Sequence, residues 1–219
     1  MYIQNKFSKS IVFYNALYPS GYYLQDINVK NNNKIENNNK VHILLGHNAS
    51  PYLNHIRNLK RLQKYKNHID IHMPLSYGQA GYAQYVINES KKYFDEDSLH
   101  FYTDFMDSKT YIDLLSKMDF AIFDFKHQAG FGNIILLLYL GKKIYLDKHG
   151  VMSKGLSSEG LSVFDVNDIG KESLDELKSD FSKDNNVNYA YNRLNKEYIF
   201  NQWKNAFDDI LLKDMKENE

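Results

Sequence analysis

The feature that most limits how this chain can fold is a regular alternation that begins at Lys40. Short apolar runs suited to buried strands occupy residues 41–46, 68–74, 98–103, 119–125, 142–147 and 161–166. Between them lie longer segments in which apolar residues recur every three or four positions, as on one side of a helix; one set is Tyr111, Leu114, Leu115 and Met118. Strands that alternate with helices form right-handed βαβ units, and these units build a parallel sheet covered on both faces.

The sequence therefore predicts an α/β fold, a Rossmann-like parallel sheet with helices on both faces. The predicted helices begin at Ser50 and Pro51, carry Tyr82, begin at Asp107 or Ser108, occupy 132–140, and form a tail in one or two pieces over 189–215. In such sheets ligands bind beyond the carboxyl ends of the strands, where the strand order reverses. We therefore expect function in the loops GHNASP, PLSYGQAGY, TDFMD and KHQAGFGN, which follow the first four strands.

A polar, asparagine-rich segment, NVKNNNKIENNNK, spans residues 28–40 and holds no set of residues that builds a core. It divides the chain into a head and linker, residues 1–39, and an α/β domain with a C-terminal helix, residues 40–219. The head contains SIVFYNALYPSGYY, one predicted strand and a turn, which is too little to fold alone. We expect Ile11 to Tyr14 to pack on the main body and Asn31 to Asn39 to be mobile.

Composition excludes several classes of protein. Lysine plus arginine and aspartate plus glutamate each number 27, so the formal net charge is zero and no nucleic-acid partner is expected. The absence of cysteine excludes disulfides and thiolate chemistry. The N-terminus lacks the apolar stretch of a signal peptide, and the longest apolar run, Ile134 to Leu140, is too short to span a bilayer. We expect a cytoplasmic protein, with any membrane contact peripheral on the inner face.

The most unusual loop, FKHQAGFGN, runs from residue 125 to 133 directly into an apolar helix. A helix N-terminus leaves several backbone N–H groups unpaired, and its dipole favours an anion. Gly130 and Gly132 let the backbone approach a ligand closely, and Asn133 can turn its amide toward it, which describes a phosphate-binding turn. The segment matches neither the P-loop nor the GxGxxG pattern, and an ordinary strand-to-helix turn explains the same residues.

Two further loops place polar or aromatic residues at the same predicted edge. GHNASP offers Gly46, His47 and Asn48 between a strand and a capped helix, and PLSYG places Ser76 and Tyr77 where a tyrosine can stack on a planar base. Each loop also has a purely structural interpretation. The first is then a tight turn with asparagine in the left-handed conformation, and the tyrosines of the second cover the sheet edge.

Other signals indicate structure rather than chemistry. The strand histidines lack the spacing of metal ligands relative to carboxylates, so the sequence predicts neither a metal site nor a cofactor. Trp203 and Phe207, four residues apart in the tail, are interpreted as core residues. His55, taken alone, is interpreted as a surface histidine.

Taken together, the loops resemble one family, the bacterial TDP-N-acetylfucosamine:lipid II N-acetylfucosaminyltransferases of glycosyltransferase family 56. ILLGHNASPYLNHI is similar to the family segment ILxGNSxxxxNxH. MPLSYG followed by Tyr82, then TDFMDSKTYIDLLSKMDFAIF, then HQAGFGNIILLLYLGKKIYL resemble later family blocks in the same order. The resemblance runs from about Lys40 to Asp147.

The resemblance implies the C-terminal, Rossmann-like half of a two-domain GT-B glycosyltransferase, the half that holds the nucleotide-sugar donor. It maps the donor-binding residues onto Gly46, Asn48, Asn54, His55, Ser76, Tyr77, Gln128, Gly130, Gly132 and Asn133. Lys126 and His127 join them as the cations beside the diphosphate, and His127 stands where the family pattern has arginine. The catalytic base stays unassigned, because the resemblance implies that it comes from the acceptor-binding, amino-terminal half.

We therefore expect a glycosyltransferase, or its donor-binding half. It would transfer an amino-deoxy sugar such as N-acetylfucosamine from a dTDP-sugar to a polyprenyl-diphosphate-linked acceptor in bacterial surface polysaccharide assembly. The head resembles only the last strand and turn before the donor half, so a truncated product, a degenerate relative or a split enzyme with a separate acceptor-domain chain would each explain the sequence. Two rival interpretations stay open: a non-catalytic nucleotide-sugar-binding module and a protein-interaction domain.

Overall fold

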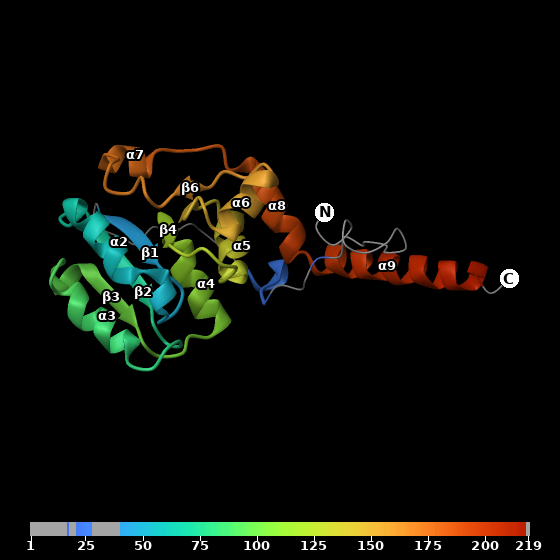
Figure 1. The fold of residues 1–219 in the computed structure, drawn as a ribbon, viewed down its shortest axis with the longest axis horizontal. Coiled ribbons are helices and arrows are strands. Elements are labelled where there is room, and N and C mark those ends of the chain that lie inside the picture. Colours follow the sequence, from blue (N-terminus) through green and yellow to red (C-terminus); the bar gives the residue numbers. More distant parts are fainter. Residues whose placement is uncertain (1–16, 18–20, 28–39, 218–219) are drawn as a thin grey trace.

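The computed structural model describes residues 17, 21–27 and 40–217. The predicted head strand at Ile11 to Tyr14 and the linker at Asn31 to Asn39 lie outside the described residues, so both expectations stay predictions. The described chain forms an α/β body from which one long helix, α9 (Lys196–Glu217), extends (Figure 1). A short 3-10 helix, η1 (Leu24–Asp26), lies near the start of α9.

The described body is built on a sheet of six parallel strands in the order β3-β2-β1-β4-β5-β6. The strands are β1 (Val41–Leu45), β2 (Ile69–Pro74), β3 (Leu99–Tyr102), β4 (Phe120–Phe123), β5 (Lys143–Leu146) and β6 (Phe164–Asp165). The predicted Rossmann-like sheet is confirmed, with slightly shorter strands than the sequence indicates. Because all strands run in one direction, the loops that follow them emerge together at the carboxyl edge, as predicted.

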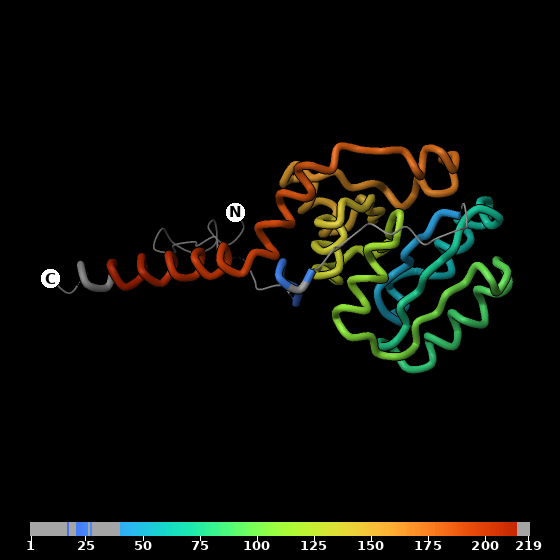
Figure 2. Tube along the Cα trace, turned by 180° about the vertical axis from the view of Figure 1, so that it is seen from behind, coloured from blue at the N-terminus to red at the C-terminus, as the bar shows by residue number. Residues whose placement is uncertain are grey.

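Helices cover both faces of the sheet (Figures 1 and 2). They are α2 (His55–Leu62), α3 (Tyr82–Ser90), α4 (Ser108–Ser116), α5 (Phe131–Tyr139), α6 (Val151–Ser158), α7 (Leu174–Lys178) and α8 (Asp184–Leu194), with 3-10 turns η2 (Pro51–Leu53), η3 (Gln63–Tyr65) and η4 (Glu96–Ser98). Side chains alternate across each strand and so build two apolar layers. Leu44 packs with residues of α4, α5, α6 and α8 on one face, and Ile43 packs with residues of α2, α3 and α7 on the other. In α5, residues Ile134 to Leu138 are all buried, which explains why its sequence is apolar all round.

The segment after β1 differs from the single helix that Ser50 and Pro51 predict. A 3-10 turn, η2, is followed by Asn54 in the left-handed conformation, with φ of 52°, and α2 begins only at His55. The Asn54 amide donates hydrogen bonds to the carbonyls of Tyr52 (3.1 Å) and Asp124 (2.8 Å). These bonds stabilise a backbone conformation that asparagine tolerates better than most residues.

The remaining helices agree with the sequence in part. The Asp107 side chain accepts a hydrogen bond from the Thr110 N–H at 2.9 Å, so the predicted cap of α4 is confirmed. The helical tail does consist of two pieces, α8 and α9. The sequence pattern predicts neither α6 nor α7, because α6 contains a glycine and three serines in eight residues and α7 is only five residues long.

The projecting helix α9 contradicts one interpretation. Trp203 and Phe207 are 40% and 57% exposed, so neither is a core residue. Figure 2 shows the helix from behind, again clear of the body. Within the residues described, no helix combines the length and the apolar content that crossing a membrane needs.

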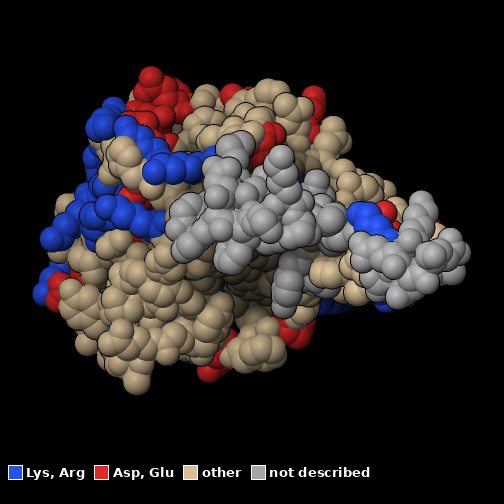
Figure 3. Space-filling view, turned by 45° about the vertical axis from the view of Figure 1, so that its right-hand side comes forward, with Lys and Arg blue, Asp and Glu red and all other residues tan. Residues whose placement is uncertain are grey.

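Charge is balanced overall but not evenly mixed on the surface. On the face drawn in Figure 3, lysine and arginine side chains gather at the left, and an acidic patch lies above them. Several lysines near the amino edge of the sheet have structural partners. The Lys40 ammonium lies 2.9 Å from an Asp70 carboxylate oxygen, and Lys143 donates to the carbonyl of Glu176 at 3.0 Å.

A row of histidines crosses β1, β2 and β3. The distance from His42 Nδ1 to His72 Nε2 is 3.1 Å, and from His72 Nδ1 to the Tyr102 hydroxyl oxygen it is 2.8 Å. The ring of His100 stacks on that of His72 at 4.5 Å. Burial, reinforced by the neighbouring His100 and His42, lowers the pKa of His72 to about 3, although Asp70 opposes this shift. His72 is therefore neutral in the folded protein at neutral pH.

We predict that acid destabilises this fold, and that His72 contributes to the effect. His72 stays neutral in the folded chain but protonates in the unfolded chain below its ordinary pKa of about 6.5, so the unfolded state binds more protons there. Stability is present above that pH and falls by about 1.4 kcal/mol per pH unit for each such histidine as the pH drops toward the folded pKa. Urea unfolding at several pH values between 7.5 and 5 measures this slope.

His72→Phe should give a shallower dependence of stability on pH than the wild-type chain. His68→Phe removes an exposed histidine immediately before the same strand and should keep the wild-type slope. Equal slopes for wild type and His72→Phe would contradict the assignment.

Candidate functional site

The loops after β1 and β2 are joined at the carboxyl edge. The Ala49 N–H donates to the Tyr77 carbonyl at 2.7 Å, and the Gln79 N–H donates to the Ala49 carbonyl at 2.9 Å. On the other side, the Gly46 N–H donates to the Ile122 carbonyl of β4 at 2.9 Å. These bonds satisfy buried backbone groups and hold the β1 loop between its two neighbours.

The strand order reverses between β1 and β4, and α5 begins there. Gly130, in the left-handed conformation with φ of 58°, precedes the helix without a side-chain cap. The Ile134 N–H donates to the Gly130 carbonyl at 3.0 Å, which leaves Phe131, Gly132 and Asn133 at the open N-terminus. Their N–H groups find no acceptor among the described residues and are available to a ligand.

Two adjoining cavities open at this point. The aromatic cavity, of about 200 Å³, is lined by Tyr22, His47, Pro74, Ser76, Tyr77, Phe105, Met106, Ser108, Tyr111 and Asn133. The helix-end cavity, of about 450 Å³, is lined by Gly21, Tyr22, His47, Asn48, Tyr52, Tyr77, Ser108, Ala129, Gly130, Phe131, Gly132 and Asn133. Among the described residues that line them there is no carboxylate.

Unpartnered polar atoms concentrate around these cavities. Within the described residues, the buried side-chain atoms that lack a hydrogen-bond partner are His47 Nδ1, Asn48 Oδ1, His55 Nε2, the Tyr111 hydroxyl and Asp124 Oδ1. Such atoms are rare in folded proteins because an unmade hydrogen bond inside the protein is costly. His47, Asn48 and Tyr111 line the cavities, so a bound polar ligand can supply the missing partners.

His47 lies under the start of α5. A side chain at Gly130 would place its Cβ 2.9 Å from His47 Cε1, so the left-handed glycine also makes room for this ring. Burial, reinforced by the nearby His127, lowers the pKa of His47 to about 4. The imidazole is therefore neutral at neutral pH and offers hydrogen bonding rather than charge.

His55 is not the surface residue that it resembles in isolation. Its side chain is fully buried, and a Cβ at Gly46 would lie 2.6 Å from its Nε2. Burial first, and then the charge of a protonated His47, lower the pKa of His55 to about 4. It packs under the β1 loop and does not line either cavity.

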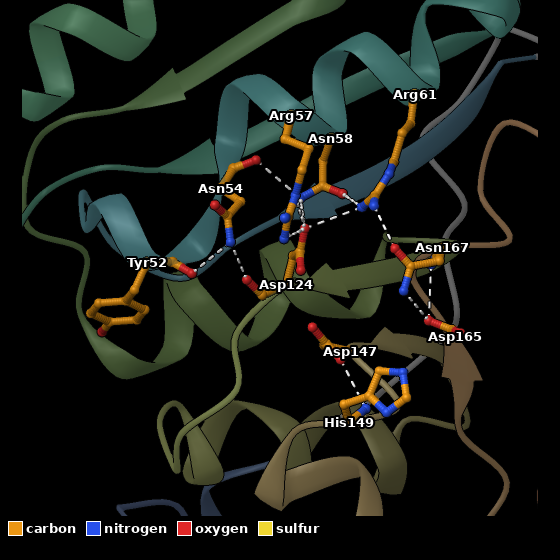
Figure 4. A network of polar contacts seen from close by, with 10 residues as sticks. All are labelled: Tyr52, Asn54, Arg57, Asn58, Arg61, Asp124, Asp147, His149, Asp165 and Asn167. Atoms are coloured by element: carbon orange, nitrogen blue, oxygen red, sulfur yellow. Dashed lines mark hydrogen bonds and ion pairs between the residues drawn. The ribbon is translucent and has the colours of Figure 1, made fainter.

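A buried ionic network holds the end of β4 (Figure 4). The Asp124 side chain is fully buried, and its Oδ2 lies 2.6 Å from Arg57 Nη2 and 3.1 Å from Arg61 Nη1. The Asn58 amide donates to the same oxygen at 3.1 Å, and the Asn54 amide donates to the Asp124 backbone carbonyl at 2.8 Å. One face of α2 thus fixes the residue from which the β4 loop departs.

The network continues toward β6. The Arg61 Nη2 donates to the Asn167 side-chain oxygen at 2.6 Å, and Asn167 donates in turn to Asp165 at 2.8 Å. Arg61 therefore joins β4 to the segment after β6, as Figure 4 shows.

The structure brings half of the predicted site residues together. Those that line the two cavities are Asn48, Ser76, Tyr77, Gly130, Gly132 and Asn133. Gly46, Asn54 and His55 lie behind them and support the loops. Lys126, His127 and Gln128 are exposed on the β4 loop outside the cavity walls, with the His127 ring 4.4 Å from that of Tyr52.

Sequence reasoning misses much of the aromatic wall. Phe105 and Met106 lie in the TDFMD loop, which the sequence predicts to carry function, although no pattern marks either as a site residue; Tyr22 lies in none of the predicted loops. Tyr111 fits the helix periodicity of a core residue, yet it also lines the aromatic cavity. Burial raises the pKa of that hydroxyl well above its usual value, so it stays protonated and can donate a hydrogen bond. Among the described residues, no three histidine or carboxylate side chains converge as metal ligands do.

Asp124→Asn should lower the stability of the folded chain by about 3 kcal/mol, because it removes a fully buried negative charge that pairs with Arg61 and with the half-exposed Arg57. Urea unfolding at pH 7.5 measures the loss. Asp113→Asn, an exposed position on α4, is the matched control and should change stability by less than about 0.5 kcal/mol. A similar small effect at Asp124 would mean that the network is dispensable.

The sequence and the fold of this chain are both similar to those of known glycosyltransferases. The family model for the 4-alpha-L-fucosyltransferases, glycosyl transferase group 56, matches residues 4–210. Solved structures are similar in fold at low sequence identity. A glycosyltransferase from Rickettsia africae is 14% identical with a TM-score of 0.63, covering 80% of this chain and 49% of its own.

Two further solved structures are also similar to this chain in fold. Anabaena Alr3699/HepE, solved in complex with UDP and glucose, is 17% identical with a TM-score of 0.59, covering 78% of this chain and 48% of its own. WaaG, a glycosyltransferase involved in lipopolysaccharide biosynthesis, is 11% identical with a TM-score of 0.53, covering 80% and 50%. The chain therefore spans about half the length of the solved structures that it matches, and its fold resembles one Rossmann-like half of a GT-B glycosyltransferase. The match over nearly all of its residues means that the chain belongs to glycosyltransferase family 56, the 4-alpha-L-fucosyltransferase group.

Proposed function

We propose that this chain is the donor-binding half of a glycosyltransferase and that the two cavities hold a nucleoside-diphosphate sugar. The observation that carries the proposal is the convergence on two adjoining cavities of the open α5 N-terminus and of residues that each have one unpartnered polar side-chain atom, His47, Asn48 and Tyr111. The donor would be a dTDP-linked amino-deoxy sugar such as N-acetylfucosamine, and the acceptor a polyprenyl-diphosphate-linked saccharide at the inner face of the membrane. Family membership and the similarity to WaaG and HepE support this assignment.

The diphosphate belongs in the helix-end cavity. The N–H groups of Phe131, Gly132 and Asn133 are positioned to bind its oxygens, and the helix dipole adds about 0.3–1 kcal/mol, up to roughly 2 in a partly buried site. A Cβ at Gly132 would meet nothing closer than a Tyr22 ring carbon at 3.7 Å. The fold therefore tolerates a side chain at Gly132, and close approach of a ligand is the reason that remains for glycine there.

The base belongs in the aromatic cavity. Tyr77 is 59% exposed and Phe105 is 89% exposed at its rim, which are high values for residues of this kind. Stacking of a base on an aromatic ring contributes about 1–3 kcal/mol. The Tyr111 hydroxyl can donate to a base carbonyl and thereby satisfy its own missing hydrogen bond.

The chemical role of this half is electrostatic. The departing dTDP carries negative charge, and preorganised N–H groups in a closed site stabilise such charge as it develops. Lys126 and His127 lie on the exposed β4 loop that leads to the helix-end cavity, where the His127 ring is 4.4 Å from that of Tyr52, a lining residue, and Lys126 would add positive charge. The Lys126 carbonyl accepts from the Val151 N–H at 2.8 Å, so the loop backbone is anchored while its side chains stay accessible.

A second candidate function is a module that binds the nucleotide sugar without turnover. It is favoured by the lack of a carboxylate in the described cavity walls and by the lowered pKa of His47, about 4, which makes its imidazole a weak base for the acceptor. A separate chain with the acceptor site would supply the base in the first proposal. Transfer of radiolabelled sugar to a polyprenyl-diphosphate acceptor separates the two candidates. Isothermal titration with dTDP separates both from a pure protein-interaction domain, which has no nucleotide affinity.

Gly132→Val should abolish dTDP binding, because the valine side chain fills the space where the diphosphate approaches the α5 backbone. The fold should persist, since the position is open. Isothermal titration with millimolar dTDP measures binding, and circular dichroism checks the fold. Gly155→Val, at a helical glycine of α6 whose Cβ would meet nothing within 4 Å, is the control and should bind dTDP normally. Undiminished affinity in folded Gly132→Val would remove the helix-end assignment.

His127→Arg should strengthen dTDP binding roughly five-fold, equivalent to about 1 kcal/mol, because arginine adds a fixed charge and a fork that suits phosphate. Thymidine, which lacks the diphosphate, should bind with unchanged affinity. His149→Arg adds the same charge to the exposed loop after β5, outside the cavity walls, and should have little effect. An equal gain from both substitutions would indicate a general charge effect and not a contact at residue 127.

A further inference from the structure

The projecting helix α9 carries a stripe of exposed apolar side chains. Its members are Phe200 (65% exposed), Trp203 (40%), Phe207 (57%), Ile210 (40%) and Leu211 (61%). At 100° per residue these five positions fall within an arc of about 100° on one side of the helix. A row of this size is unusual on a surface that faces only water.

The stripe borders the side of α9 that already has contacts, and Trp203 belongs to both. The Leu17 N–H donates to Gln202 Oε1 at 3.1 Å, and the Leu17 carbonyl accepts from Trp203 Nε1 at 2.9 Å. Ile199 and Ala206, next to the stripe on that side, are buried. Phe200, Phe207 and Leu211 lie on the side of the stripe that is away from these contacts.

The charges beside the stripe argue against a lipid surface as its occupant. Residues 196–217 include four lysines and five acidic residues, so the helix has no excess positive charge to attract anionic lipids. Lys204 and Asp208, on the free flank of the stripe, pair within the helix at 2.7 Å, and Lys213 and Asp209 pair likewise at 2.7 Å.

The same charges suit a second helix of identical sequence. In an antiparallel pair related by a twofold axis near residue 206, the middle of the stripe, Lys204 of one helix lies level with Asp208 of the other. The apolar stripes then face each other, and opposite charges meet along one flank. Figures 1 and 2 show α9 clear of the α/β body, so a second copy can lie along it without a clash between the bodies.

The available area is adequate for such a contact. Five large side chains that are each about half exposed on two copies remove on the order of 1,000 Å² from water, near the lower bound for a specific interface. We propose that the stripe is a dimer interface at which α9 of a second copy of this chain packs antiparallel on α9. The proposal does not depend on the donor site.

Sedimentation equilibrium of the full chain between about 1 and 100 µM tests the proposal. The wild-type chain should show the mass of a dimer within this range. Phe207→Asp should shift it to a monomer, with an unchanged circular dichroism spectrum and unchanged dTDP affinity. Tyr198→Asp alters an aromatic of similar exposure, 40%, on the opposite side of α9 and should leave the dimer intact.

A charge exchange tests the antiparallel register. Lys204→Asp and Asp208→Lys should each weaken self-association, because like charges then meet across the twofold axis. An equimolar mixture of these two variants should recover the dimer, since each supplies the charge that the other needs. A wild-type monomer at 100 µM would overturn the proposal. A dimer that Phe207→Asp does not disturb would overturn it too, because the contact would lie elsewhere.

Discussion

The reversal of strand order at β1 is the constraint on which the rest of the molecule depends. β1 pairs with β2 on one side and β4 on the other, and the chain leaves β1 and β4 toward opposite faces of the sheet. A space must open between the two loops, and no further strand can fill it. The bonds from Gly46 to Ile122 and from Ala49 to Tyr77 then satisfy the backbone that this separation would otherwise leave unpaired.

Charge is distributed differently on the two sides of this opening. On the α2 side, Asp124 is surrounded by Arg57 and Arg61, so a buried negative charge is neutralised inside the protein. On the cavity side, the described walls hold neutral hydrogen-bonding groups and helix N–H groups but no carboxylate. The arrangement keeps protein anions away from the place where a ligand anion is expected, and it anchors the loop that must receive it.

Much of the fold follows from sequence because it depends on local periodicity. Buried parallel strands are apolar throughout, and the α5 helix is apolar because the sheet covers it, so both are visible as runs. The break at Asn54 is different: its left-handed conformation is stabilised by the Asp124 carbonyl, 70 residues away. The exposure of Trp203 and Phe207 also escapes a pattern-based interpretation, because an apolar spacing of four does not reveal whether anything packs on it.

The residues of the candidate site also fall into two groups, those that the sequence reveals and those that only the three-dimensional structure reveals. Gly130, Gly132 and Asn133 are recognisable because a helix start with glycines is a local feature. Tyr22 and Tyr111 reach the cavity only because η1 and α4 approach α5 in three dimensions, which no spacing encodes. His55 looks like a surface residue until the close approach of Gly46 explains its burial.

The magnitudes also limit what this half can do alone. A helix N-terminus contributes up to roughly 2 kcal/mol and a stacked base about 1–3 kcal/mol, with about 1 kcal/mol for each additional net hydrogen bond. Against this stands the cost of immobilising a flexible ligand, so an affinity of about 0.1–1 mM for dTDP is expected, far weaker than the micromolar binding that needs about −8 kcal/mol. The missing binding free energy would have to come from contacts to the sugar. A second protein surface on the open side of the two cavities, away from the sheet, would provide such contacts. In the proposed function, a donor that binds weakly to this chain and tightly only with a second protein surface in place would be protected from reaction until the acceptor is bound.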